Sequence, residues 1–432
     1  MNALAEIEAR ARLGQADEAA RAYREAVALA PGSVEGWRGL ARTLQLLRDV
    51  PGAVDAWEHV VALAPSDWQA HNDLGAALME SGAWASAEAA LASASRAAPD
   101  EPTVLVNRAR LDVRRGRAAI AAAALEELGA RHGELPPALA GLGFALRELG
   151  RDDDHVAALR GATALAPDDA IAACGLGRAL LEAGAAGEAS TVAQSYLRRR
   201  PGHAGALALE ALARLALGDA EAVRRLLDYE RLVARRQLPV PDGFTDLGAF
   251  NRALAAHAAT RPTLVPSPTS HAAARGLHSG SPRVTDRGPV AAFERMLRAV
   301  VSDYWRVLPD LALPPFTPNR PGAGFFDMWC VVLQRGGHQV PHIHPEAWLS
   351  GVYYPQLPQL PAEIRSGTGC EGWLEFAPPD RPFPSRLRPP TLRVRPVEGL
   401  LVLFPSYLHH RTIPFEGDGT RVSVAFDFVP AR

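Results

Sequence analysis

The chain has few cysteines and little net charge. Three cysteines occur among the 432 residues, at positions 174, 330 and 370, and no two of them form a CxxC pair. This spacing argues against a disulfide framework or a zinc ribbon, and it fits a reducing compartment such as the cytoplasm. The formal net charge is −2. The composition therefore provides no general attraction to nucleic acid or to an anionic membrane.

Long apolar runs are also missing. The first 20 residues have neither a basic start nor a continuous apolar stretch, so we expect no secretory signal peptide. No apolar segment is long enough to span a bilayer. Hydrophobic side chains nevertheless make up 48% of the chain, which is enough for packed cores. From the length we expect two or more domains of a cytoplasmic protein that binds neither nucleic acid nor membrane.

Residues 1–230 repeat with a period of 34. Prolines in this register stand at positions 31, 65, 99, 167 and 201, with Gly133 at the skipped position. Small residues share the register: Ala41, Gly75, Ala109, Gly143, Gly177 and Ala211. A second small series, Ala19, Ala53, Ala87, Ala121 and Ala189, is interrupted by His155 and Val223. The pattern resembles tetratricopeptide repeats, which implies an α-solenoid of helix pairs. Small residues let the paired helices approach closely, and the proline ends the second helix.

The composition changes after the repeats. The break LPVPDGF at 238–244 favours a boundary between a repeat array, 1–230, and a second domain, 231–432. Residues 245–310 are expected to form two helical stretches around a polar loop at 267–288. Short β-rich runs follow at 326–334, 348–357, 372–377, 391–397, 399–408 and 421–429. They predict a sandwich or open barrel, and so a multidomain α + β protein.

Histidines gather in two segments of the second domain. His342 and His344 are two residues apart, so in an extended strand their side chains project from one face and can reach a single metal ion. A third ligand from a distant segment would complete a facial set and leave other positions open. A non-haem iron oxygenase needs that arrangement because its cosubstrate and oxygen both bind the metal.

Three ordered blocks carry a resemblance to a known family. They are PHIHPEAWLSGVYY at 341–354, FPSYLHHRTIPF at 404–415 and RVSVAFDF at 421–428. These blocks resemble the 2-oxoglutarate- and iron(II)-dependent oxygenases of bacteria that carry tetratricopeptide repeats, and the likeness covers residues 240–432. It implies a double-stranded β-helix, or jelly roll, with flanking helices. It also implies an enzyme that hydroxylates a C–H bond while 2-oxoglutarate is converted to succinate and carbon dioxide.

The resemblance assigns roles to individual residues. His342 and His410 match the family's metal histidines, and with His344 they are expected to bind Fe(II). Arg421, eleven residues after His410, matches an arginine that pairs with the distal carboxylate of 2-oxoglutarate. A planar guanidinium suits that task because it binds a carboxylate through two hydrogen bonds. Tyr354 is expected to donate a further hydrogen bond to the same carboxylate.

Other readings stay open at this point. The broader superfamily has His-x-Asp or His-x-Glu, so Glu346 could replace His344 as the third ligand, or a two-histidine site could remain. Cupins share the β-helix, and a three-histidine cupin dioxygenase that does not use 2-oxoglutarate is an alternative, although Arg421 has no role in it. A repeat scaffold with a degenerate oxygenase domain is the third possibility.

The repeat array suggests a partner. Such arrays usually bind peptides or proteins on a concave face, so we expect a peptide or protein substrate. Arginines expected to face that groove, from the register of the small residues, are Arg38, Arg42, Arg110, Arg147 and Arg178. They favour an acidic segment as the partner, although a merely solvated helix face is an equally valid interpretation.

Overall fold

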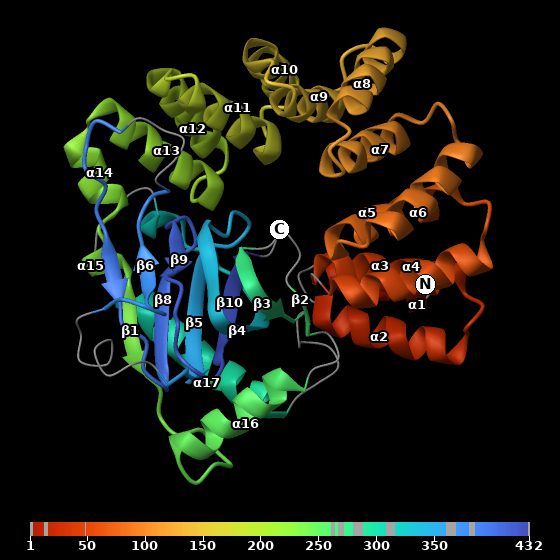
Figure 1. Cartoon of the computed structure of the whole chain (residues 1–432). Helices are drawn as coiled ribbons and strands as arrows, with labels where there is room; N and C mark the ends of the chain where they lie inside the picture. The colour runs from red at the N-terminus through yellow and green to blue at the C-terminus, as the bar shows by residue number, and fades with distance from the viewer. Residues whose placement is uncertain are drawn as a thin grey trace. The chain divides into compact units, whose positions relative to one another are not determined.

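The computed structural model describes residues 3–12, 16–47, 49–260, 264–266, 272–279, 288–307, 316–359, 369–379 and 385–430. The chain divides into two compact units, Met1–Tyr196 and Leu197–Arg432, coloured from red to yellow-green and from green to blue in Figure 1. No helix in the described ranges has both the length and the apolar character needed to cross a bilayer.

The first unit is built from consecutive helix pairs, which confirms the predicted solenoid (Figure 1). The helices are α1 (Ala3–Arg12), α2 (Ala16–Leu29), α3 (Val34–Leu46), α4 (Val50–Leu63), α5 (Trp68–Ser81), α6 (Trp84–Ala97), α7 (Pro102–Arg114), α8 (Ala118–His132), α9 (Pro136–Glu148), α10 (Asp152–Leu165), α11 (Ala170–Glu182) and α12 (Ala186–Arg199).

The residue two positions after a repeat proline caps the next helix. Ser33 accepts a hydrogen bond from the Gly36 amide at 3.1 Å, and Asp67 accepts one from Ala70 at 3.1 Å. The equivalent caps are Glu101, Asp169 and His203. A side-chain N-cap stabilises a helix by about 1 kcal/mol because it satisfies a free backbone amide. The 34-residue period therefore sets where each first helix begins.

The glycines Gly75 and Gly143 of the small-residue register lie close to a leucine of the paired helix. A Cβ atom added at Gly75 would lie 2.6 Å from Cγ of Leu91, on the paired helix α6. At Gly143 it would lie 2.9 Å from Cγ of Leu159, on α10. No real Cβ tolerates such distances, so the register residues are small because the second helix of the pair occupies their space.

In the described ranges, the second unit combines five helices, a short 3₁₀ turn and ten strands. The helices are α13 (Ala204–Leu217), α14 (Ala220–Leu226), α15 (Tyr229–Leu232), α16 (Leu247–Ala259) and α17 (Gly288–Val307), with the turn η2 (Thr317–Asn319). The strands are β1 (Ala234–Gln237), β2 (Val265–Pro266), β3 (Ala273–His278), β4 (Gly324–His342), β5 (Leu349–Gln356), β6 (Leu374–Phe376), β7 (Leu392–Val394), β8 (Leu400–Pro405), β9 (His410–Thr412) and β10 (Arg421–Pro430).

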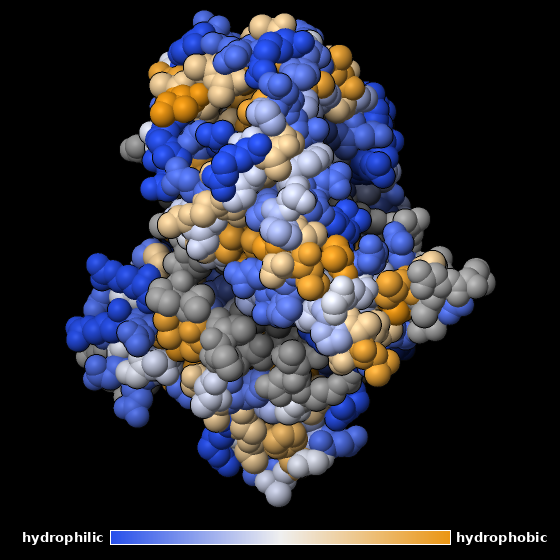
Figure 2. Space-filling view, turned by 90° about the vertical axis from the view of Figure 1, so that its right-hand side faces the viewer, coloured by the Kyte–Doolittle hydropathy of each residue, from blue (hydrophilic) through white to orange (hydrophobic). Residues whose placement is uncertain are grey.

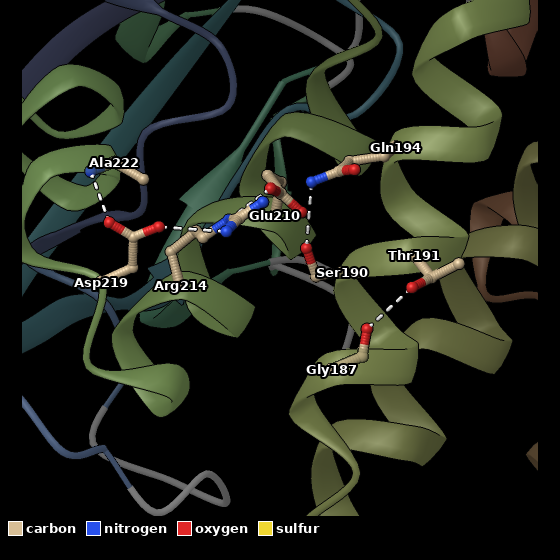
Figure 3. Close-up of polar contacts among 8 residues, drawn as sticks. All are labelled: Gly187, Ser190, Thr191, Gln194, Glu210, Arg214, Asp219 and Ala222. Carbon is tan, nitrogen blue, oxygen red and sulfur yellow. Dashed lines mark hydrogen bonds and ion pairs between the residues drawn. The ribbon is translucent and has the colours of Figure 1, made fainter.

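Helix α13 keeps the repeat register but packs into the core of the second unit. Leu207 and Leu215 of α13 share one buried cluster with Leu401 and Phe404 of β8. The sequence repeat therefore extends further than the first compact unit. The repeat pattern continues toward residue 230, whereas the compact units divide after Tyr196. The end of α13 is held by Arg214, which donates to Glu210 at 2.7 Å and to Asp219 at 3.0 Å (Figure 3).

The sheet forms the expected jelly roll. Its order is β1-β8-β5-β10-β4-β9-β6-β7, with β3 against β4 and β2 against β3, and all pairings are antiparallel. Each predicted β-rich run contains a strand. One expectation was wrong in part, because β3 lies inside the segment predicted as a polar loop. Its sequence AARGLH has no strand signal of its own, and its pairing with β4 supplies the backbone partners.

Strand β10 has one apolar face and one polar face. Val422, Val424 and Phe426 alternate with Arg421, Ser423 and Asp427. The apolar set faces α16 and α17, where Phe293 lies 5.2 Å from Tyr353 and 6.3 Å from Phe426 between ring centroids. The polar set therefore faces the interior of the jelly roll, and this alternation positions the candidate site.

Candidate metal and cosubstrate site

Three histidines from two parts of the sheet come together. Strand β4 ends at His342 and β9 begins at His410, and the two residues are paired in the sheet register. His344 lies just beyond β4. One ring nitrogen from each histidine lies within 4.8 Å of the others, and Nε2 of His344 is 3.3 Å from Nε2 of His410. The predicted set is thus a spatial group that could hold a metal ion.

The outward-facing ring nitrogens all have acceptors. Nδ1 of His342 donates to the Val340 carbonyl at 2.8 Å, and Nδ1 of His410 donates to the Leu408 carbonyl at 3.0 Å. Nδ1 of His344 donates to Oδ2 of Asp427 at 3.0 Å. With the proton on Nδ1, each ring leaves an Nε2 lone pair available. Hydrogen bonds of this kind orient imidazoles as metal ligands.

Burial keeps two of these rings neutral. Burial, assisted by the neighbouring His344, lowers the pKa of His342 to about 3. Burial also holds the pKa of His410 well below its usual range, and the neighbouring histidines act in the same direction. Neutral imidazole is the form that binds metals, and three imidazoles suit iron, zinc, copper or nickel.

Glu346, the alternative third ligand, and the neighbouring His338 lie outside this cluster. Glu346 is exposed in a turn that follows His344, so it does not share a strand face with the histidines, and the three-histidine group does not include it. His338 donates from Nδ1 to the Gly336 carbonyl at 3.1 Å in the strand before the group. Pro345 begins the turn that takes Glu346 out of the extended segment.

Arg421 is a buried charge with no carboxylate partner among the described residues. It is 1% exposed, and its Nη1 donates to Ser423 Oγ at 3.3 Å. Within the described ranges, Nε and Nη2 have no partner. Burial lowers the pKa of Arg421, and the one group that opposes this effect is Tyr354. A guanidinium buried in this way is costly unless an anion joins it.

Tyr354 lies against this guanidinium. The guanidinium carbon is 4.9 Å from the centroid of the Tyr354 ring, a cation–π distance. The Tyr354 hydroxyl is buried, and it has no hydrogen-bond partner in the described part of the chain. Burial raises the pKa of Tyr354, so the hydroxyl keeps its proton. Arg421 and Tyr354 thus offer three unused donor atoms to a carboxylate.

Aromatic side chains surround the histidines. The Trp329 ring stacks on His344 at 5.5 Å, and the Phe404 ring lies 4.6 Å from His410. Phe376 lies 4.9 Å from Phe404 and 6.1 Å from His410. These rings lower the local polarity around the imidazoles, which strengthens electrostatic interactions there.

Comparison with known proteins agrees with the two-part organisation. Residues 327–427 match the family described as "Putative 2OG-Fe(II) oxygenase", and residues 2–43 and 47–102 match tetratricopeptide repeat models. The chain carries a domain of that family behind tetratricopeptide repeats. The matched oxygenase domain contains the three histidines, Arg421 and Tyr354.

Solved structures similar to part of this chain include tetratricopeptide repeat proteins. A tetratricopeptide repeat protein from Parabacteroides merdae is 14% identical, with a TM-score of 0.43, over 53% of this chain and 91% of its own. A thermophilic one from Thermus thermophilus is 24% identical, with a TM-score of 0.34, over 39% and 92%. The Cut9–Hcn1 complex is 20% identical, with a TM-score of 0.40, over 46% and 40%. No curated protein sequence matches the chain.

Two features of the site were missed by the sequence argument. Asp427 bonds to His344, and Ser350 bonds to Asp427 at 2.6 Å. The sequence did contain a signal for Asp427. It lies six residues after Arg421 on the same strand, and therefore on the same face as the predicted carboxylate-binding arginine. The stacking of Trp329 on His344 had no comparable signal, because it depends on how β4 and the turn after it pack.

Proposed function

We propose that the second unit is an Fe(II)- and 2-oxoglutarate-dependent dioxygenase that hydroxylates a C–H bond. His342, His344 and His410 are the metal ligands of this proposal, and Arg421 and Tyr354 bind the distal carboxylate of 2-oxoglutarate. Two observations together support this proposal. Three imidazoles are grouped, and the buried guanidinium of Arg421 has two nitrogen atoms without a partner among the described residues. A cupin-type dioxygenase without 2-oxoglutarate has no use for that guanidinium.

The protein's own residues have distinct tasks in this function. The three Nε2 atoms would hold iron(II), and their Nδ1 hydrogen bonds keep the rings in the ligating orientation. Arg421 would bind the cosubstrate carboxylate through Nε and Nη2, and Tyr354 would donate its hydroxyl proton to the same group. Trp329, Phe376 and Phe404 would limit access of water. Iron(II) with 2-oxoglutarate supplies the oxygen activation.

The test is an anaerobic titration of the full-length protein with iron(II) and 2-oxoglutarate, followed by admission of oxygen. We expect a weak visible charge-transfer band when both are present, and succinate after oxygen is added. Iron binding without a band and without succinate would favour the cupin alternative. No iron binding at all would favour a scaffold with a degenerate domain.

The repeat array is proposed to recruit a peptide or protein substrate in the cytoplasm. Tetratricopeptide repeats generally mediate protein–protein interactions. The face of the molecule drawn in Figure 2 is mainly hydrophilic, with apolar residues in separate groups. Two arginines of the expected groove already have acidic partners: Arg38 pairs with Asp67, and Arg147 lies 3.0 Å from Glu182. Arg42 and Arg110 also interact electrostatically with Asp73 and Glu80, so of these five arginines Arg178 is the one for which no acidic neighbour is described.

A further inference from the structure

His344 is oriented differently from the other two histidines. His342 and His410 each donate from Nδ1 to a backbone carbonyl two residues earlier in the chain. Those acceptors are fixed by the local backbone. His344 instead donates to a side chain 83 positions away, Oδ2 of Asp427 on β10. Its orientation therefore depends on the fold of the whole sheet.

Asp427 is itself held by two buried serines. The register pairs Asp427 with Ser350 of β5, and Ser350 Oγ donates to Oδ1 of Asp427 at 2.6 Å. Ser406, just after β8, lies 2.8 Å from Ser350 between hydroxyl oxygens. The Ser406 carbonyl also accepts the His344 amide at 3.1 Å. Both carboxylate oxygens of Asp427 are thus bonded, one to His344 and one to a fixed hydroxyl.

The charge of Asp427 matters for a site of this composition. Three neutral imidazoles leave the full double positive charge on a bound divalent ion, whereas a ligand set with one carboxylate halves it. A carboxylate that accepts the Nδ1 proton makes the imidazole a stronger electron donor to the metal. Asp427 therefore stands where it can supply this negative charge through His344 rather than by binding the metal itself.

We propose that Asp427, braced by Ser350 and Ser406, is a positioning residue that aligns His344 as a ligand and compensates for the missing carboxylate in the three-histidine set. This proposal rests on the metal site of the proposed function. It predicts that the charge of Asp427 changes metal affinity and reduction potential, and that the serines act only through Asp427.

The experiment uses the full-length protein without 2-oxoglutarate. Metal stoichiometry and affinity are measured anaerobically with iron(II), and with cobalt(II) as a spectroscopic probe, for Asp427→Asn, Ser350→Ala and His344→Ala. We expect Asp427→Asn to keep one metal per chain but to bind it roughly 10- to 100-fold more weakly. Ser350→Ala should weaken binding less, and His344→Ala should remove most of it.

A second readout separates charge from mere folding. The iron(III)/iron(II) potential of Asp427→Asn should be more positive than that of the wild type, because loss of a nearby negative charge favours the less positive ion. Glu375→Gln is the matched control. Glu375 is another buried carboxylate, but it bonds to Arg393 and Arg411, each at 2.6 Å. We expect the potential of that variant to be unchanged.

Three results would overturn the proposal. Wild-type affinity and potential in Asp427→Asn would show that the charge is irrelevant. Complete loss of the metal from Asp427→Asn, with retention in His344→Ala, would make Asp427 a direct ligand. An equal shift of potential in Glu375→Gln would show a general effect of buried carboxylates. If the wild type binds no metal, the proposed function fails first, and that outcome is distinct from these three.

Discussion

Exposed arginines of the repeat array differ from one buried arginine of the second unit. The chain contains no lysine, so all 46 of its basic side chains are arginines. In the array, Arg147 and Arg160 pair with Glu182 and Glu188 on neighbouring repeats, and their side chains are 42% and 57% exposed. In the second unit, Arg421 is 1% exposed and has no carboxylate partner in the described structure.

This difference separates stability from function. An exposed ion pair contributes about 0–1 kcal/mol, because water already solvates both charges. A buried charge without a counterion lowers stability by several kcal/mol, since it gives up hydration and receives little in return. A bound anion would remove this cost, and the proposed 2-oxoglutarate carboxylate is such an anion.

The largest effect is expected from the metal ligands. His410→Ala should reduce 2-oxoglutarate-dependent succinate formation to the level of the iron-free protein, because one of three imidazole ligands is lost. The neighbouring variant His409→Ala is the control and should retain turnover. Succinate is measured by chromatography with and without added iron(II). Full iron-dependent turnover by His410→Ala would show that the ligand assignment is wrong.

Replacing Arg421 is expected to weaken the use of 2-oxoglutarate without lowering the stability of the protein. Arg421→Met should raise the 2-oxoglutarate concentration needed for half-maximal turnover at least tenfold, since a desolvated charge pair contributes roughly 2–5 kcal/mol. The same variant should unfold at equal or higher denaturant concentration, because an uncompensated charge is replaced by an apolar chain. Arg147→Met should change neither quantity appreciably. An unchanged 2-oxoglutarate requirement in Arg421→Met would favour a cupin-type enzyme.

Metal binding should distinguish His344 from Glu346. His344→Ala should lose most of the metal affinity, whereas Glu346→Gln should retain it, because the structure groups His344 with the other histidines and leaves Glu346 exposed. Cobalt(II) titration of both variants provides the measurement. The reverse ranking would identify a His-x-Glu set formed by His344, Glu346 and His410.

Sequence patterns predicted the two units unequally well. In the array, the 34-residue period identified the small packing positions, because both helices of a pair lie within one repeat and their contacts are local. In the jelly roll, each predicted strand was found, but β3 was taken for part of a loop. Strands β1 and β9, with four and three residues, also have no sequence signal. Their hydrogen-bond partners come from distant strands, which local propensity does not reveal.

The candidate site shows the same limit at the level of single residues. Spacing predicted that His342 and His344 share a face, the family resemblance added His410, and the structure brings the three together. Alternation along β10 places Asp427 on the same face as Arg421, but the sequence does not show that His344, 83 positions earlier, reaches this carboxylate.

Removing the array tests whether it recruits the substrate. A chain that begins at Leu197 should fold and decarboxylate 2-oxoglutarate normally, yet hydroxylate the native substrate less efficiently than the whole protein. A chain that begins at residue 231 should be unstable, because it lacks Leu207, Leu215 and Leu226 from the core of the second unit. Circular dichroism checks folding, and product per succinate measures coupling. Equal coupling with and without the array would contradict recruitment.

The same array offers a charge test in the whole chain. Arg42→Glu combined with Arg178→Glu should weaken binding of an acidic substrate, and the wild-type affinity should fall as salt rises, because exposed charges are screened over about 8–10 Å. Arg96→Glu, on the second helix of its pair, is the matched control. Loss of affinity that is equal in the control and in the double variant would argue against a groove-specific contact.

The smallest effect is expected at His155, where the array departs from its own repeat. This buried histidine fills a position that is alanine in most repeats, and its Nδ1 donates to the Gly143 carbonyl at 2.7 Å. Burial lowers the pKa of His155, and the nearby Arg147 acts in the same direction. The unfolded chain therefore takes up the proton more readily than the folded one once the pH falls below about 6.5. Stability from this residue is present above that pH and is lost on acidification.

His155→Ala should make unfolding of the array less sensitive to acid. At pH 8 the variant is expected to be less stable by about 1 kcal/mol, because it lacks the hydrogen bond to Gly143. As the pH falls to 5, the difference in free energy of unfolding between wild type and variant should become smaller, because the variant has no group at this position to protonate. Urea unfolding followed by helical circular dichroism at pH 8, 6 and 5 gives the comparison, with the exposed His132→Ala as control. If the difference in free energy of unfolding stays constant across this pH range, His155 is equally protonated in the folded and unfolded states. Its burial then has no effect on the acid stability of the array.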